Sequence, residues 1–326
     1  MANTPLAERY RDRLPLTAAT PIVTLGEGDT PLLPAPRLSA SLGLEVWLKW
    51  EGQNPTGSFK DRGMTVAVSK ALEEGAQAVI CASTGNTAAS AAAYAARAGL
   101  PALVLQPAGA VAIGKLAQAR ALGARLLEVR GSFDEALAVA RELASRGTHV
   151  LVNSLNPYRI EGQKTAALEI LEQLGGQPHV VALPYGGGGN TCAYVKGFEE
   201  AGRLPRILAV EASNRDHTAA SAIRIADPAH AAEVAAVLER SRGRVVTVSD
   251  EAILDAWRAL AREEGIFCEP ASAAGVAGLA HAELEPGTRV VCVVTGHGLK
   301  DPEAAVRLTP PPLAVDPDPD AIAALA

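Results

Sequence analysis

The sequence lacks the features of a metal-binding, secreted or nucleic-acid-binding protein. Its 326 residues contain four cysteines, Cys81, Cys192, Cys268 and Cys292, and none of them forms a CxxC pair. Three of the four lie in apolar runs, so we expect buried free thiols in a reducing cytosol and no metal site. The net charge is -6, and no block of lysines and arginines stands out. Because nucleic acids and anionic membranes attract clustered positive charge, neither is an expected partner.

Long apolar runs are also missing. The segment Met1–Leu16 carries several charged residues and no continuous apolar core, so we do not expect a signal peptide. The alanine-rich stretch Ala88–Ala98 is too short to span a bilayer and contains Arg97. These features predict a cytoplasmic protein.

Several nucleotide and hydrolase motifs are absent. There is no G-x-G-x-x-G, which argues against a nucleotide-binding oxidoreductase, and there is no HExxH or G-x-S-x-G. The segment Gly109–Leu116 matches G-x-x-x-x-G-K, but Leu116 stands where a P-loop needs a hydroxyl to hold magnesium.

The chain does contain short β-branched or apolar runs that alternate with helical patterns, which is typical of parallel α/β sheets. The expected strands are Ala78–Cys81, Ala102–Leu105, Arg125–Val129, His149–Val152, Val180–Leu183, Ile207–Val210, Arg244–Val248 and Val290–Val294. The expected helices are Ala88–Ala98, Gly114–Leu122, Asp134–Ala144 and Asp250–Glu264, the last capped by Ser249 or Asp250.

The order of these elements predicts an α/β protein of two domains with doubly wound, mostly parallel sheets. We expect a small mobile domain over residues 76–152 and a large domain made of residues 1–75 and 153–326, ending in a loosely docked tail from Pro310 to Ala326. Ligands of such sheets bind at the carboxyl ends of the strands, so the loops there are the candidate site.

The first candidate loop is Asn54–Gly63, in which Pro55 and Gly57 indicate a turn and Ser58 is a plausible helix cap. Lys60 then lies in the first helical turn, where the positive end of the helix dipole lowers its pKa, as burial under Phe59 also would. A lysine with a pKa of roughly 7–8 suits imine chemistry. The alternative is a solvated lysine beside Asp61.

Two further loops join a strand to a helix. In Ser83–Thr87, small hydroxyl and amide side chains converge on free helix N–H groups, which suits an anion such as a carboxylate; simple N-capping is the alternative. In Gly186–Thr191, four glycines allow backbone N–H groups to form a phosphate nest; a flexible linker is the alternative.

The fourth loop is Thr295–Asp301, at the end of the last apolar strand. It offers the Thr295 hydroxyl as a hydrogen-bonding group. His297 is either a catalytic base or, as is commoner for a lone loop histidine, a structural hydrogen-bond donor.

Together these loops resemble those of the fold-type-II pyridoxal-phosphate (PLP) enzymes, the tryptophan-synthase-β-like family, and most closely the bacterial threonine synthases. The resemblance covers most of the chain. The stretches that carry it are Glu51–Gly63 (EGQNPTGSFKDRG), Cys81–Gly99 (CASTGNTAASAAAYAARAG), Val152–Thr165 (VNSLNPYRIEGQKT), Ala261–Ala274 (AREEGIFCEPASAA) and Thr295–Asp301 (TGHGLKD). The third and fifth are the most particular to threonine synthases.

The resemblance implies a PLP-dependent lyase that converts O-phospho-L-homoserine and water to L-threonine and phosphate, as a homodimer. Lys60 would hold the cofactor as a Schiff base, and Thr295 and Asn86 would contact the pyridine nitrogen and 3′-oxygen. The cofactor phosphate would lie on Gly186, Gly187, Gly188, Gly189 and Asn190. The substrate carboxylate would bind Ser83, Thr84 and Thr87, and the substrate phosphate would bind Lys115, Asn153, Ser154 and Arg159, with both cations expected in loops that follow strands.

The chain departs from the family pattern in the segment Glu211–Thr218, which is shorter than in the relatives, and in the glycine loop. Many threonine synthases read G-N-A-G-N where this chain has Gly186–Asn190 as GGGGN, which is closer to amino-acid dehydratases. The alternative function is therefore a threonine or serine dehydratase, which uses the same cofactor for β-elimination. Lys115 and Arg159 favour the phosphorylated substrate.

Overall fold

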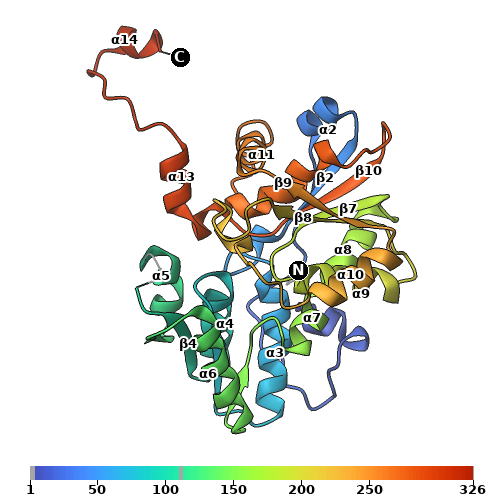
Figure 1. Ribbon diagram of the computed structural model, residues 1–326, viewed down its shortest axis with the longest axis vertical. Helices are drawn as coiled ribbons and strands as arrows, with labels where there is room; N and C mark the ends of the chain where they lie inside the picture. Colours follow the sequence, from blue (N-terminus) through green and yellow to red (C-terminus); the bar gives the residue numbers. More distant parts are fainter. Residues whose placement is uncertain (1–3, 110–112, 326) are drawn as a thin grey trace.

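The computed structural model describes residues 4–109 and 113–325, apart from the side chains of residues 113–115, 320 and 321. It contains two twisted sheets with helices on their faces (Figure 1). The strands are β1 (Leu32–Pro34), β2 (Glu45–Trp50), β3 (Ala78–Ala82), β4 (Ala102–Pro107), β5 (Arg125–Val129), β6 (His149–Leu151), β7 (Val180–Pro184), β8 (Arg206–Ala212), β9 (Arg244–Val248) and β10 (Arg289–Val294). The α-helices are α1 (Leu6–Arg9), α2 (Pro36–Leu42), α3 (Lys60–Glu73), α4 (Asn86–Ala98), α5 (Ile113–Ala121), α6 (Phe133–Ser145), α7 (Pro157–Gln163), α8 (Thr165–Leu174), α9 (Gly189–Glu200), α10 (Ala231–Arg240), α11 (Asp250–Arg262), α12 (Ala274–Ala277), α13 (Pro302–Leu308) and α14 (Pro319–Ala323).

The larger sheet has six strands in the order β1-β2-β10-β7-β8-β9, and only β1 is antiparallel to its neighbour. The central strands β7 and β10 pair in parallel, with Val291 opposite Val181. All of β7 is buried and so is almost all of β10, as expected when helices cover both faces. Because parallel strands end at the same edge, the segments after β7 and after β10 lie close together.

The smaller sheet has four parallel strands in the order β5-β4-β3-β6. Successive residues of β3 face opposite sides, as the strand period requires. Val79 and Cys81 join a hydrophobic cluster with α3 and α4, and Ile80 and Ala82 pack with Ala136 of α6. The α3 helix therefore packs on the smaller sheet although it precedes residue 76, and the division of the chain into domains at that position stays a prediction.

The sequence predicted most of these elements. All eight expected strands and all four expected helices are present, with ends that differ by two residues at most. The Ser249 hydroxyl caps α11 by accepting from Ala252 N at 3.1 Å, and Ile253, Trp257 and Leu260 are buried on one face. Strands β1 and β2 were not predicted.

A buried ionic network fixes α3 against the larger sheet. The Arg62 guanidinium donates to Glu51 at 2.7 Å and to Glu169 of α8 at 2.6 Å. Lys49 of β2 donates to Glu169 at 2.8 Å. All four side chains are at most 1% exposed, so two positive and two negative charges balance inside the protein.

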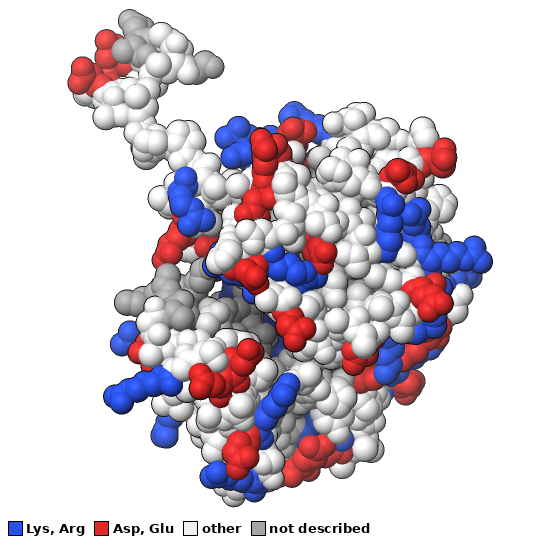
Figure 2. All heavy atoms as spheres, in the orientation of Figure 1, with Lys and Arg blue, Asp and Glu red and all other residues white. Residues whose placement is uncertain are grey.

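The remaining features of the surface agree with the composition. Acidic and basic side chains are interspersed on the face seen in Figure 2.

The four cysteines are free, and Cys81, Cys268 and Cys292 are buried. In the described part of the chain, no helix combines the length and the apolar character needed to cross a membrane. The C-terminal segment is exposed over residues 310–319 and 322–325, and α14 stands away from the rest of the chain (Figure 1).

Helices α3 and α7 approach each other closely through two glycines. A Cβ on Gly63 would lie 2.6 Å from Arg159 Nε, and a Cβ on Gly162 would lie 2.7 Å from Gly63 Cα and collide with the Arg62 carbonyl oxygen. The two helices can therefore cross at this distance only without side chains at these positions, and their contact brings Arg159 next to the start of α3.

We predict that Gly162→Ala lowers the free energy of unfolding by about 1–3 kcal/mol, because the new methyl group overpacks this contact. The measurement is urea denaturation followed by circular dichroism. Gly176→Ala is the matched control, since a Cβ there meets nothing within 4 Å. Equal stability of the two variants would show that α3 and α7 separate without cost.

Candidate functional site

Lys60 is the first residue of α3, as expected, but Ser58 does not cap the helix. The N-cap is Phe59, which provides no side-chain cap, and the Ser58 hydroxyl is buried without a partner. Ser58 is instead paired with Gly296 in an isolated β-bridge, and Phe59 N donates to Thr295 O at 3.0 Å. The prediction of a Ser58 cap is therefore wrong, because this backbone pairing directs the loop toward the end of β10.

The Lys60 amine lies in a low-dielectric environment. Its Nζ is 4.3 Å from the centroid of the Phe59 ring. Burial lowers the pKa of Lys60 to about 7; the positive charge of Arg159 acts in the same direction, and Glu269 opposes the shift. The neighbouring Asp61 does not pair with it: its carboxylate accepts from Thr56 and Ser90, each at 2.6 Å, and burial raises its pKa to about 6. A solvated lysine paired with Asp61 is thus not what the structure contains.

The glycine loop connects β7 to the N-terminus of α9. Gly188 has a φ of 90°, a conformation that favours glycine, and a Cβ on Gly186 would lie 3.1 Å from Ile223 Cα. Both polar atoms of the Asn190 amide and the Thr191 hydroxyl are buried without partners. Buried polar groups normally have partners, so this helix start lacks an acceptor that a ligand would supply. These observations fit the phosphate of PLP.

Thr295 directly follows β10 and lies beside the Lys60 loop. The residue is 4% exposed, and its hydroxyl lies 2.8 Å from the hydroxyl of Ser272, which also accepts from Gly296 N at 2.8 Å. Sequence reasoning did not single out Ser272. The pair of hydroxyls can hydrogen-bond a pyridine nitrogen without a formal charge.

The Ser83–Thr87 loop joins β3 to α4. The Ser83 hydroxyl accepts from Gly85 N at 3.3 Å and from Ala88 N at 3.2 Å, so the capping interpretation holds for this residue. Thr84 and Thr87 are partly buried and make no side-chain hydrogen bond within the described residues. Asn86 Nδ2 donates to Glu269 Oε1 at 2.9 Å, which links this loop to the larger sheet.

Asn153 and Ser154 follow β6 and lie in different surroundings. The Asn153 amide makes two hydrogen bonds to the backbone of Ala82, at 3.0 and 2.8 Å, and so fixes the end of β3. Ser154 Cβ is 3.6 Å from where a Cβ on Gly189 would lie, which places it beside the glycine loop. His230, also missed from sequence, lies there too: its ring nitrogen is 3.2 Å from Ser154 O, and its backbone N–H donates to Gly187 O at 3.1 Å.

Arg159 is fully buried, and its hydrogen-bond partners among the described residues are a carbonyl and an amide, with no carboxylate. Its Nη1 donates to Val152 O at 2.7 Å, while Nε has no acceptor. Burial lowers the pKa of this guanidinium to about 10. Arg159 lies in α7 and not in a loop, because Asn156 accepts from Tyr158 N and Pro157 occupies the first turn. The expected loop position is wrong, and Asn156-Pro157 was the signal for the helix.

Two predicted residues, Lys115 and His297, and the nearby Lys300 remain to be placed. Lys115 lies in α5, so its expected loop position is wrong as well, and its side chain is outside the part of the chain that the structure describes. His297 stacks on Trp50 with ring centroids 6.4 Å apart, and its Nδ1 accepts from Leu299 N at 3.1 Å. These contacts fit a structural role for His297, although the ring nitrogen accepts this hydrogen bond where a donor was expected. Lys300 Nζ donates to Thr56 O at 3.1 Å and to Gln118 of α5 at 2.5 Å.

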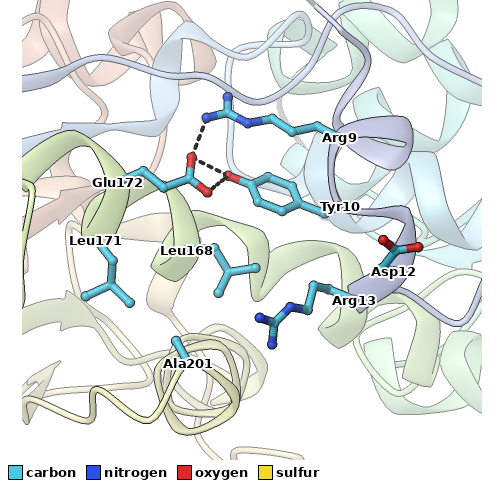
Figure 3. Close-up of a pocket in the computed structure, with 8 residues that line it drawn as sticks. All are labelled: Arg9, Tyr10, Asp12, Arg13, Leu168, Leu171, Glu172 and Ala201. Carbon is cyan, nitrogen blue, oxygen red and sulfur yellow. Dashed lines mark hydrogen bonds and ion pairs between the residues drawn. The ribbon is translucent and has the colours of Figure 1, made fainter.

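A pocket elsewhere on the molecule does not involve these loops. It lies between the N-terminal segment and the helices α8 and α9 (Figure 3). Glu172, one of the two acidic residues that line it, already accepts from Tyr10 at 3.1 Å and from Arg9. None of the residues predicted for the site lines this pocket.

Comparisons with known proteins agree with this geometry. Residues 23–296 match the family model described as "Pyridoxal-phosphate dependent enzyme". The threonine synthase of Halalkalibacterium halodurans is 50% identical over 92% of this chain and 91% of its own length, and that of Mycobacterium leprae is 50% identical over 96% and 93%. Among solved structures, a threonine deaminase from T.th. superimposes with a TM-score of 0.71 at 29% identity, covering 82% of this chain and 92% of that one. The cysteine synthase of Entamoeba histolytica, at 21% identity and a TM-score of 0.77 over 88% and 90% of the two chains, shares the fold.

The fold and the loops at its strand ends are those of a fold-type-II enzyme that depends on pyridoxal phosphate. The chain belongs to the pyridoxal-phosphate-dependent enzyme family and, within it, to the threonine synthases.

The lowered pKa of Lys60 predicts how the free amine reacts. Above pH about 7 most of the amine is neutral and nucleophilic, and below it the amine is protonated. The rate at which the cofactor-free protein binds pyridoxal phosphate covalently should therefore rise from about pH 6 to about pH 8 and level off. The measurement is stopped-flow absorbance over this range, with free lysine as the reference. A rate that keeps rising to about pH 10, as for an ordinary lysine, would contradict the prediction.

Proposed function

We propose that this enzyme converts O-phospho-L-homoserine and water to L-threonine and phosphate, by γ-elimination and β-hydration. The observation that carries the proposal is Arg159: a fully buried guanidinium without a carboxylate partner among the described residues, close enough to Lys60 to lower its pKa. An unpaired buried cation is costly, and a phosphate dianion from the substrate would compensate it. The threonine synthases at 50% identity support the same reaction.

The residues around Lys60 suit PLP. Lys60 Nζ would hold it covalently, Gly186–Asn190 would bind its phosphate, and Thr295 and Asn86 would contact its ring. The bound cofactor supplies an electron sink for the charge that develops at the substrate carbons.

Lys60 is the proposed base. The reaction removes one proton each from Cα and Cβ of the substrate and expels phosphate from Cγ; it then returns one proton to Cγ and one to Cα and adds water at Cβ. A base that takes a proton and returns it works best when its pKa is near the working pH, and burial places the pKa of Lys60 at about 7.

Two groups of polar residues would hold the substrate. Ser83, Thr84 and Thr87 would bind its carboxylate at the N-terminus of α4, which has the donors for an anion. Arg159, Lys115, Asn153 and Ser154 would bind or position its phosphate. The Asn153 amide is already bonded to Ala82, so its part is to hold the loop that carries Ser154.

We further propose a domain movement, an oligomeric state and a cellular location. The small domain, residues 76–152, would close over the substrate to exclude water until it is needed. The family resemblance supports a homodimer, and the free buried cysteines support a reducing cytoplasm.

Replacing Arg159 tests which reaction is native. Arg159→Ala should lower kcat/KM for O-phosphohomoserine by at least about tenfold, because a charge-assisted hydrogen bond to phosphate is worth roughly 1.5–3 kcal/mol. Any weak β-elimination of threonine should be nearly unaffected, since threonine carries no phosphate. The measurement is steady-state kinetics with both substrates.

Arg240→Ala is the control for loss of a cation, because Arg240 is exposed and paired with Glu199 at 2.7 Å. Equal losses of Arg159→Ala on both substrates would mean that Arg159 is structural or binds the common carboxylate. Rapid dehydration of threonine by the wild type, with no threonine formed from O-phosphohomoserine, would assign the enzyme to the dehydratases.

Replacing Lys60 tests the covalent attachment. Lys60→Ala should abolish nearly all turnover, and borohydride treatment followed by mass spectrometry should find no cofactor bound to the protein. Lys70→Ala, in the same helix but paired with Glu73, should keep both properties. Reduced cofactor on the Lys60→Ala variant would assign the attachment to another lysine.

A further inference from the structure

Glu269 lies where the loops of the site meet. It precedes the short 3-10 helix Pro270–Ala273, and its N–H donates to Gly296 O at 3.1 Å. Its backbone is thus fixed to the loop that carries Thr295. The residue is only 4% exposed.

The Glu269 carboxylate has an unusual set of neighbours. Unlike Glu51 and Glu169, it has no lysine or arginine within ion-pair distance among the residues described. Its one side-chain hydrogen bond there comes from Asn86 Nδ2, at 2.9 Å from Oε1. This bond joins α4, on the smaller sheet, to a loop of the larger sheet.

The surrounding backbone is shaped to admit this carboxylate. A Cβ on Gly296 would collide with Glu269 Oε1, so glycine at that position makes room for the acid. Burial raises the pKa of Glu269 to about 7; the bond from Asn86 and the charges of Lys300 and Lys60 lower it, and Asp301 raises it. The acid is therefore placed at an energetic cost, which a purely packing role would not require.

We propose that Glu269 is a positioning residue, whose carboxylate holds the Asn86 amide in the one orientation that serves the cofactor ring. In its ionised form the Glu269 carboxylate only accepts hydrogen bonds, so that form selects the amide orientation that presents Nδ2 to it. The second hydrogen of Nδ2 is then directed by the same plane and is available to the ring oxygen. Without Glu269, the amide is free to rotate and present its own oxygen instead.

This inference rests on the cofactor site proposed above, and a double-mutant cycle tests it without substrate. The full-length protein is freed of cofactor and titrated with pyridoxal phosphate, and the dissociation constant and the visible absorption maximum are recorded. The proteins are the wild type, Asn86→Ala, Glu269→Ala, Glu269→Gln and the double variants. Thermal unfolding of each cofactor-free protein checks folding.

Asn86→Ala should weaken cofactor binding by about tenfold or more, the loss of one charge-assisted hydrogen bond. Glu269→Ala should cause a loss no larger than this, with the same direction of spectral shift. In the Asn86→Ala background the Glu269 substitutions should change the dissociation constant by less than about twofold, because residues that act through one another are not additive.

Glu269→Gln keeps the volume and a hydrogen-bond acceptor, so its loss of cofactor affinity should be intermediate. It replaces Glu269→Ala in the double-mutant cycle if that variant does not fold. Effects that multiply in the double variants would overturn the proposal, as would wild-type binding and spectrum in Glu269→Ala. Since these readouts need no substrate, failure to form threonine from O-phosphohomoserine would refute the proposed reaction and leave this result standing.

Discussion

The buried network of Lys49, Glu51, Arg62 and Glu169 is the constraint on which the position of Lys60 depends. It connects β2, the start of α3 and α8, and its charges cancel within hydrogen-bonding distance. A buried ion pair adds little net stability, but removing one member leaves an uncompensated charge, so the arrangement tolerates few alternatives. The first turn of α3 is therefore fixed relative to the larger sheet, while the rest of that helix packs on the smaller sheet with α4. Because α3 contacts both sheets, it fixes the position of the Lys60 amine at its N-terminus relative to each of them.

The buried charges nearest Lys60, in contrast, are not paired with opposite charges in the described part of the chain. Arg159 is fully buried with backbone and amide partners, and Glu269 is buried with an amide partner. Within the described residues, the chain pairs its buried charges where the fold must be rigid and leaves them without an opposite charge around the amine. Such buried charges shift pKa values, and here Lys60 and Glu269 both move to about 7 from opposite directions. Such clustering of shifted groups is a property of functional sites, because ligands supply the missing charges and donors.

The sequence allowed prediction of what depends on local pattern. The strand Val180–Leu183 followed by four glycines located the helix start that we propose binds the cofactor phosphate, and an apolar strand followed by Thr295 located its neighbour in the sheet. Strand β2 escaped because Glu45–Trp50 contains two charged residues, and the charge that allows Lys49 to be buried, Glu169, lies 120 residues away. Ser58 was misread as a cap because its pairing with Gly296 is equally remote in sequence. Glu269 was missed for the same reason: Asn86 is 183 residues away. A lone acid within the run Phe267–Ala271 was the available signal.

The two glycines of the α3–α7 contact show how a site residue can depend on packing that carries no chemistry. Gly63 and Gly162 allow the helix backbones to meet, and the meeting places Arg159 against the helix that begins with Lys60. The motif R-I-E-G-Q around Arg159 therefore has two functions in one turn. The arginine provides a positive charge, and the glycine three residues later allows the two helix backbones to approach each other closely. A larger residue at 162 would move the guanidinium away from the amine, and the pKa of Lys60 would rise toward its ordinary value because one of its depressing charges had withdrawn. Burial lowers the pKa of Lys60 most, and the further contribution of Arg159 depends on how closely the two helix backbones approach.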